Sequence, residues 1–294
     1  MGDLSGNVQK IIDSATQAYA QGARLLLTPE LALCGYAAED LYLRPAFIAA
    51  CDEALAQLKA ASAQWPGMAL VIGHPQQDAA GAQLFNAASV LRDGQLLARY
   101  AKQLLPNFDV FDEQRYFAAG NQPCVVEVDG LNIGLLICED AWHPAPAKAA
   151  VEAGAQLLVV INASPFHSGK QAEREAVLAQ RAVQTGVPLI YAHLVGGQDE
   201  IVFDGGSFAV QASGQIAARA AAFAEDLPLV VAELVNGQVT LAGEIKPAPD
   251  HHQALWSALV LGVRDYVGKN GFPGAIIGLS GGMDSALVLA IAVD

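Results

Sequence analysis

The chain alternates between apolar stripes with helical spacing and short apolar runs of strand length. Helical stripes are predicted within residues 11–19, 45–63, 144–154 and 170–186. Short apolar runs next to turn residues predict buried strands at residues 24–27, 68–73, 157–162 and 188–193. Helices and strands that alternate in this way are typical of an α/β fold.

Two-residue turns divide other apolar segments into strand pairs. Asp93-Gly94 interrupts residues 86–102, and Asp129-Gly130 joins residues 124–128 to residues 131–138. An Asp-Gly dipeptide between two apolar runs is a strong hairpin signal. Closing strands are predicted at residues 207–211 and 229–234. Because strands outnumber helices, we expect two sheets.

The composition changes near residue 243. Residues 243–252 contain two prolines and a polar Asp-His-His run, which is typical of a linker. Beyond it, a helical stripe consists of Leu255, Leu259, Val263, Tyr266 and Val267. Residues 274–279 then predict a short buried strand, and an apolar helix follows up to Asp294. We therefore divide the chain into one large domain at residues 1–243, a linker at 244–252, and the start of a second domain at 253–294.

Composition and charge restrict the possible partners. The 294 residues are 53% hydrophobic, which is enough for a large buried core, and the formal net charge is −14. This charge repels a phosphate backbone, so we expect no nucleic-acid partner. No apolar run approaches the roughly 20 residues that span a bilayer, so we expect no membrane contact and a cytoplasmic location. The four cysteines form no Cys-x-x-Cys pair, which argues against a zinc site or a disulfide framework.

Three chemically useful side chains follow or end predicted strands: Glu30, Lys102 and Cys138. Attack of a thiol on an unreactive amide needs a base to take the proton and a cation or dipoles to hold the oxyanion. Glu, Lys and Cys can supply these three roles. On the residue types alone, a surface glutamate and a packed core cysteine remain open as alternatives.

A second chemical pattern lies at residues 278–285, which read Gly-Leu-Ser-Gly-Gly-Met-Asp-Ser. Glycines at a strand-to-helix turn let backbone N–H groups approach phosphate oxygens, and the hydroxyls of Ser280 and Ser285 can add donors. The pattern is not a Walker A loop. An ordinary tight turn explains the Gly-Gly pair but fits the whole sequence poorly.

Four short motifs in the first domain occur in a recognisable order. They are Pro29-Glu30-Leu31, Lys102 with Leu105-Pro106-Asn107, residues 138–142 (Cys-Glu-Asp-Ala-Trp) and residues 162–166 (Asn-Ala-Ser-Pro-Phe). Together they resemble the nitrilase superfamily, and most closely its glutaminase domains in the family of glutamine-dependent NAD synthetases. The resemblance covers nearly all of residues 1–245. It implies an αββα nitrilase-like four-layer sandwich.

The resemblance also implies roles for individual residues. Cys138 would attack the side-chain amide of L-glutamine with Glu30 as general base, while Lys102 and the backbone N–H of Glu139 would stabilise the oxyanion. Ser164 and Lys170 would hold the glutamine, and Glu113 would support the catalytic group. At position 108 the family usually has a glutamine-contacting tyrosine, and this chain has Phe108. No metal is implied for this half.

The pattern at residues 278–285 resembles the pyrophosphate loop of ATP pyrophosphatases, which lies in a doubly wound α/β domain that binds nucleotides. The residues implied to bind ATP are Gly278, Leu279, Ser280, Gly281, Gly282, Met283, Asp284 and Ser285. A nitrilase-like glutaminase followed by this loop indicates an enzyme that passes ammonia to deamido-NAD, with ATP and Mg²⁺. The resemblance also implies a homo-oligomer.

Two other functions compete with this one. The first is a stand-alone amidase or carbamoylase of the nitrilase type, against which the attached loop argues. The second is a catalytically inactive fragment. The resemblance places a further strand before Gly2. A complete nucleotide-binding domain after the linker would need the length of an ordinary domain, which is on the order of a hundred residues or more. We therefore expect this chain to retain glutaminase activity at most.

Overall fold

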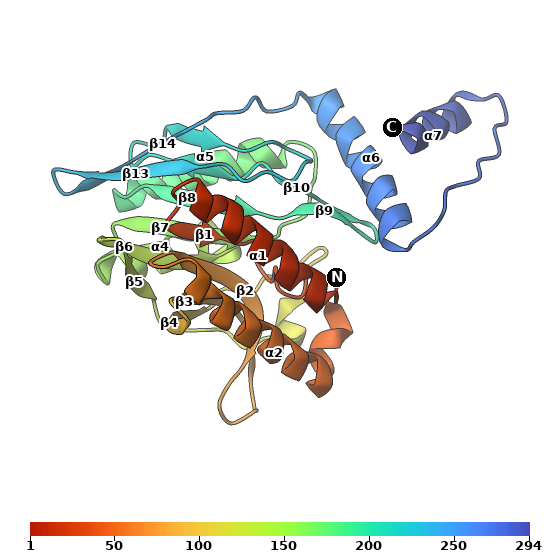
Figure 1. Ribbon diagram of the computed structural model, residues 1–294. Coiled ribbons are helices and arrows are strands. Elements are labelled where there is room, and N and C mark those ends of the chain that lie inside the picture. Colours follow the sequence, from red (N-terminus) through yellow and green to blue (C-terminus); the bar gives the residue numbers. More distant parts are fainter.

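The computed structural model describes residues 1–294 and contains a four-layer sandwich of helices, sheet, sheet and helices (Figure 1). The first sheet has the order β1-β2-β3-β4. Its strands are β1 (Leu25–Leu27), β2 (Ala69–Gln77), β3 (Leu84–Arg92) and β4 (Gln95–Ala101). The second sheet has the order β12-β11-β8-β7-β6-β5. Its strands are β5 (Val125–Val128), β6 (Leu131–Ile137), β7 (Leu157–Asn162), β8 (Leu189–His193), β11 (Phe208–Val210) and β12 (Ile216–Arg219).

Each sheet is covered by helices on its outer face, as the αββα prediction requires. α1 (Leu4–Ala20) and α2 (Pro45–Ala61) pack on the first sheet through apolar residues such as Ile11, Leu58 and Leu70. α4 (Pro144–Glu152) and α5 (Lys170–Thr185) pack on the second sheet. The two sheets bury a third apolar cluster between them. None of the helices combines the length and the apolar character needed to cross a bilayer.

Parallel pairing brings the carboxyl ends of distant strands together. β6 pairs with β7 in register Ile137↔Ile161, and β7 pairs with β8 in register Asn162↔His193. Cys138 therefore emerges beside residues 162–164, at the same edge of the sheet. In the first sheet, β1 pairs in parallel with β2, and Glu30 follows its end.

Both predicted Asp-Gly hairpins are present. Asp93 and Gly94 have φ angles of 50° and 74°, and Asp129 and Gly130 have φ angles of 51° and 82°. Positive φ at both central residues is typical of the type I′ turn that suits the twist of two antiparallel strands. The predicted helices and the buried strands of the first domain are also confirmed.

Several short elements were not predicted. They are the one-turn helix α3 (Glu139–Trp142), the hairpin of β9 (Val195–Gln198) and β10 (Ile201–Asp204), the strand β12, which pairs with β11, and the strand β14 (Gln238–Gly243), which pairs with β13 (Val230–Val235). The prediction missed β9 because its Val-Gly-Gly-Gln sequence has few side chains and no alternation. Short 3₁₀ helices occupy Glu39–Leu43, Ser62–Gln64 and Glu113–Arg115.

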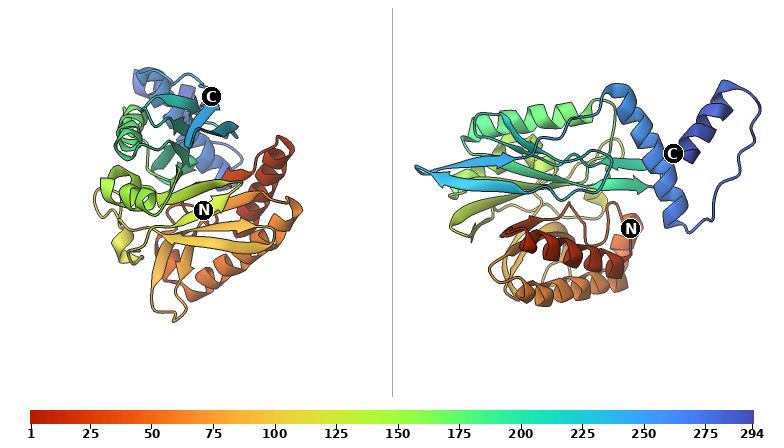
Figure 2. Two further views of the ribbon diagram at one scale, coloured as in Figure 1. Left: turned by 90° about the vertical axis from the view of Figure 1, so that its left-hand side faces the viewer. Right: turned by 45° about the horizontal axis from the view of Figure 1, so that its top comes forward.

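The strand predicted at residues 274–279 is wrong. These residues form no strand, and the side chain of Ile276 is completely exposed. A strand needs a neighbouring backbone to satisfy its N–H and C=O groups, and no other part of the chain pairs with this segment. The helix predicted after it is present as α7 (Met283–Val293), which lies apart from the sandwich (Figure 1 and the right-hand view of Figure 2).

α6 (His251–Lys269) begins inside the predicted linker and packs on β9 with an unexpected face. Its buried residues are Ala258 and Leu261, whereas Leu259 and Tyr266 of the predicted apolar stripe are half-exposed. The glycines of β9 allow a close approach of α6. There Asp265 Oδ2 accepts from the backbone N of Gly197 at 2.7 Å.

Candidate active site

The predicted trio is brought together at the strand ends, deep in the sandwich. Lys102 Nζ lies 2.8 Å from Glu30 Oε1 and 2.7 Å from Glu113 Oε1. Lys102 and Glu30 are completely buried, and Cys138 and Glu113 are nearly so. Four residues from four separate segments thus form one enclosed polar centre, in which Glu113 contacts Lys102.

Both carboxylate oxygens of Glu30 have fixed donors. Besides Lys102, the Asn86 amide donates to Oε1 at 2.7 Å, and the backbone N–H of Ala163 donates to Oε2 at 3.0 Å. Asn86 extends from β3 and Ala163 follows β7, so the two sheets hold this carboxylate from opposite sides. Neither residue was predicted to take part in the site, because each is an ordinary residue type far from Glu30 along the chain.

The cation at the centre is shared between two carboxylates. Burial opposes the charge of Lys102, but the charges of Glu30 and Glu113 outweigh burial and raise the pKa of Lys102 well above its usual value. Burial raises the pKa of Glu113 to about 7 despite the nearby Lys102. The Tyr36 hydroxyl also donates to Glu113 Oε1 at 3.1 Å, while Oε2 is buried without a partner. The centre therefore carries one cation that stays charged at neutral pH.

Cys138 occupies a sharp turn between β6 and α3. Its φ of 46° and ψ of −106° are unfavourable for any residue except glycine. Its backbone N–H donates to the carbonyl of Ile161 at 2.9 Å, which ties the turn to β7. Burial and the negative charge of Glu30 raise the pKa of the Cys138 thiol well above its usual value, although Lys102 opposes them. The thiol is therefore protonated in the free protein and needs a base before it can react.

Asp140 anchors this turn to the segment that follows Lys102. Its Oδ1 accepts from the backbone N–H groups of Gln103 and Leu104 at 3.0 and 2.8 Å. Its Oδ2 accepts from the Tyr100 hydroxyl at 2.8 Å and from the backbone N of Ile137 at 3.2 Å. Asp140 lies in the Cys-Glu-Asp motif, but its anchoring role was not predicted from the sequence.

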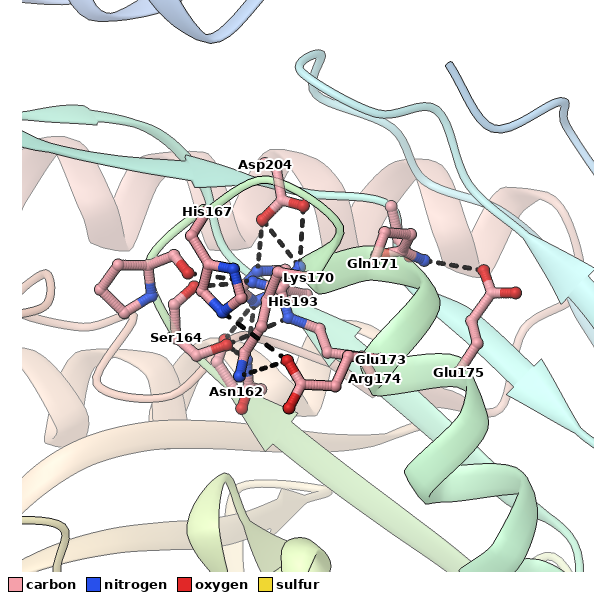
Figure 3. A network of polar contacts seen from close by, with 12 residues as sticks. Asn162, Ser164, His167, Lys170, Gln171, Glu173, Arg174, Glu175, His193 and Asp204 are labelled. Atoms are coloured by element: carbon pink, nitrogen blue, oxygen red, sulfur yellow. Dashed lines mark hydrogen bonds and ion pairs between the residues drawn. The ribbon is translucent and has the colours of Figure 1, made fainter. Parts of the chain in front are cut away.

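Ser164 follows β7 of the second sheet and Lys170 begins α5, and both belong to the polar network in Figure 3. Ser164 is buried. Lys170 Nζ lies 4.2 Å from the ring centroid of Trp142 and 3.1 Å from Glu173 Oε2. Lys170 therefore borders the segment that carries Cys138.

Phe108 and the side chain of Glu139 lie further out. They line an open hollow of about 670 Å³ together with His143, whose Nε2 lies 3.1 Å from Glu139 Oε1. The Phe108 ring is half-exposed and contacts Phe111 with 5.6 Å between ring centroids. The structure thus places Phe108 at a rim and does not bring it to the buried centre.

Residues 278–282 form an exposed loop, and residues 283–285 are the first residues of α7. The Ser280 and Ser285 hydroxyls lie 3.0 Å apart, and Ser285 also donates to the carbonyl of Gly282 at 3.0 Å. The N-cap residue of α7 is Gly282, which offers no side-chain cap, so its first N–H groups are open to an acceptor. The chemistry of this donor set fits a phosphate group.

A further hollow, of about 760 Å³, lies away from all these residues. It runs between the two sheets along the unpaired edge of β1, and its lining includes Leu25, Ile190 and Val230. Glu30, Lys102 and Cys138 do not line it.

The four-layer fold and the buried centre of cysteine, glutamate and lysine define a hydrolase that attacks carbon–nitrogen bonds. The family model described as carbon-nitrogen hydrolase matches residues 1–243, and the chain belongs to this family. A second family model, NAD synthase, matches residues 255–294.

Relatives carry both parts on one chain. The chain is 44% identical over 298 residues to the glutamine-dependent NAD(+) synthetase of Xanthomonas campestris and covers 53% of it. It superposes with a TM-score of 0.91 and 40% identity on the glutamine-dependent NAD+ synthetase of Acinetobacter baumannii, solved with adenosine diphosphate. All of this chain and 55% of that one are covered. The chain therefore spans about half the length of the synthetases that it matches.

The large domain also resembles a simpler enzyme. An amidase from Nesterenkonia sp. superposes with a TM-score of 0.65 at 32% identity, covering 74% of this chain and 81% of the amidase.

Proposed function

We propose that residues 1–243 hydrolyse L-glutamine to glutamate and ammonia through a thioester on Cys138. The observation that carries this proposal is the buried contact of Lys102 with Glu30 and Glu113, next to a strained cysteine at a strand end. Such a centre combines a nucleophile, a base and a fixed cation in a site without bulk water, where electrostatic stabilisation is strong.

In the first step, Glu30 takes the thiol proton of Cys138, and the sulfur attacks the side-chain amide carbon of glutamine. The oxyanion that forms accepts from Lys102 Nζ and the backbone N–H of Glu139. The proton on Glu30 then moves to the amide nitrogen, the carbon–nitrogen bond breaks, and ammonia leaves. The product of this step is a glutamyl thioester.

In the second step, Glu30 removes a proton from water, and the hydroxide oxygen attacks the thioester carbon. The same two donors hold the second oxyanion. When the carbon–sulfur bond breaks, the sulfur recovers its proton from Glu30 and glutamate is released. Because Asn86 and Ala163 hold Glu30 in place, one carboxylate can serve both steps without rearrangement.

Ser164 and Lys170 are the groups that we propose to hold the glutamine. Lys170 lies beside Trp142, and Ser164 is buried just after β7, the strand that pairs with β6, which supports this role. With Phe108 in place of tyrosine, the rim can offer the substrate an apolar face but no hydroxyl.

For the whole protein, we propose that the ammonia amidates deamido-NAD. The domains are the glutaminase at 1–243, a linker at 244–252 and the start of the synthetase domain at 253–294. The loop from Gly278 to Ser285 would hold ATP phosphates by its backbone N–H groups and its two serine hydroxyls, and bound ATP with Mg²⁺ would activate the acceptor. We also propose that the protein is a cytoplasmic homo-oligomer.

Ammonia release from L-glutamine by this chain tests the glutaminase proposal. Cys138→Ala should lower the rate by at least about a thousandfold, since it removes the nucleophile. Cys124→Ala is the matched control, because Cys124 is a partly buried cysteine outside the site, and its rate should equal that of the parent. Equal rates for the parent and Cys138→Ala would contradict the assignment.

The likeness to the Nesterenkonia amidase supports a second candidate, a nitrilase-type amidase or carbamoylase. Simple amides and carbamoyl compounds offered beside glutamine separate the two candidates. Faster turnover of a simple amide than of glutamine would favour the second.

A further inference from the structure

Arg174 is a completely buried arginine that the proposed reaction does not use. It extends from the second turn of α5, and Figure 3 shows its guanidinium between Asp204 and Ser164. A buried guanidinium is costly unless each of its donors is satisfied. Its contacts therefore indicate what it holds in place.

On one side, the guanidinium is fixed by Asp204 at the end of β10. Arg174 Nη1 lies 2.8 Å from both carboxylate oxygens of Asp204. Asp204 is itself held by His193 Nε2 at 3.2 Å. The direction of the arginine is therefore set by β8 and β10.

On the other side, the same guanidinium holds Ser164. Arg174 Nε donates to Ser164 Oγ at 3.1 Å, and Nη2 donates to the backbone carbonyl of Ser164 at 3.0 Å. The residue just before Ser164 is Ala163, whose N–H binds Glu30. Arg174 thus braces a short segment that contacts the proposed base and carries a proposed substrate contact.

We propose that Arg174, locked by Asp204, is a positioning residue that sets the Ser164 hydroxyl for glutamine binding. This proposal rests on the proposed function, in which Ser164 contacts glutamine. Only a planar guanidinium can bind Asp204 and both oxygens of Ser164 at once, since a lysine ammonium is a single compact charge. Lysine at this position keeps the charge but releases Ser164.

Glutamine affinity, measured by calorimetry in a Cys138→Ala background, tests the proposal without turnover. Arg174→Lys should weaken binding by about tenfold, the cost of losing one hydrogen bond to a charged group. Arg219→Lys is the matched control. Arg219 of β12 makes a bidentate ion pair, at 2.7 and 2.8 Å, with Glu175 of α5, the helix that carries Arg174. It does not contact Ser164. This control should bind glutamine within about twofold of its parent.

A double-mutant cycle separates positioning from general loss of structure. Ser164→Ala should itself weaken binding, and adding Arg174→Lys to it should change affinity by less than about twofold, because the contact is already lost. If Arg174→Lys does not fold, Asp204→Asn takes its place in the cycle with the same expectation.

Two results would overturn the proposal: unchanged affinity in Arg174→Lys, or an equal loss in the presence and absence of the Ser164 hydroxyl. If Cys138→Ala alone binds no glutamine, the proposed function fails, and this proposal falls with it. That outcome differs from the other two because it appears in the parent and not in the Arg174 variants.

Discussion

Residues 1–243 and residues 251–294 each carry a specific sequence motif, but only the residues of the first motif are buried in the fold. Glu30, Lys102 and Cys138 lie at no more than 2% exposure among two sheets, whereas Met283 of the second motif is 86% exposed. The first motif is therefore held by the fold around it, and the second rests mainly on its own loop and helix.

Sequence separation explains the difference. Glu30 binds groups that lie 56, 72 and 133 residues away along the chain. The hydroxyl of Ser285 binds groups only 3 and 5 residues away. A motif that is built by long-range contacts must fold together with the core, whereas one built by local contacts can form with little support from it.

The largest effect that separates the two regions is expected from a lysine substitution. Lys102→Met leaves the buried carboxylates of Glu30 and Glu113 without their cation and should lower the free energy of unfolding by about 3–5 kcal/mol. Lys269→Met removes the half-exposed lysine that contacts Asp265 at 3.1 Å and should cost less than about 1 kcal/mol. Urea unfolding measures both. Similar losses in the two variants would contradict the contrast.

A smaller effect is expected from acid. Burial opposes ionisation of Asp204, but hydrogen bonds from His193 and the charge of Arg174 outweigh it and lower the pKa from 3.8 to about 2. Because the folded-state pKa is lowered, Asp204 stabilises the fold above pH 4, and this contribution, on the order of 2 kcal/mol, is lost as the pH falls from about 4 to 2.

Asp204→Asn should flatten the dependence of unfolding free energy on pH over that window. Asp250, directly before the second region, is the control, because it caps α6 at the surface by accepting from the backbone N of Gln253. The hydrogen bond from Gln253 also lowers the pKa of Asp250, so Asp250→Asn should flatten the dependence too, but less than Asp204→Asn does, because Asp250 is exposed to solvent. An equally steep loss in Asp204→Asn and in the parent would show that other groups cause the acid sensitivity.

The smallest effect is expected in the exposed loop. Ser285→Ala removes two local hydrogen bonds that water can replace, so the free energy of unfolding should change by less than about 0.5 kcal/mol. Thermal unfolding monitored by circular dichroism provides the measurement. A loss above about 1 kcal/mol would mean that this loop supports the fold, and would contradict the view that the second motif depends mainly on local contacts.

The sequence predicted most of what depends on local signals. The Asp129-Gly130 turn and the apolar run after it placed Cys138 at a strand end, and the structure has it there. Glu30 and Lys102 were predicted to join it from other strand ends, and they lie in the same centre as that turn. The assignment of catalytic roles to them stays a prediction until activity is measured.

What the sequence did not predict depends on contacts between distant segments. Asn86, Asp140 and Arg174 are polar residues without a periodic or spacing signal, and each becomes informative only once its partner is known. The same reason explains the wrong strand at residues 274–279. Its apolar run was read correctly, but a strand also needs an edge to pair with, and a local pattern contains no information about edges.

The φ of 46° at Cys138 has one more consequence. An L-residue held in this conformation has a conformational free energy on the order of 1–3 kcal/mol higher than glycine would have there. Selection for robustness alone would therefore favour glycine at this position and erase the sulfur. Catalytic activity and stability therefore make opposite demands on the residue at this position. A variant library screened only for thermal stability would replace Cys138 early and lose the proposed activity.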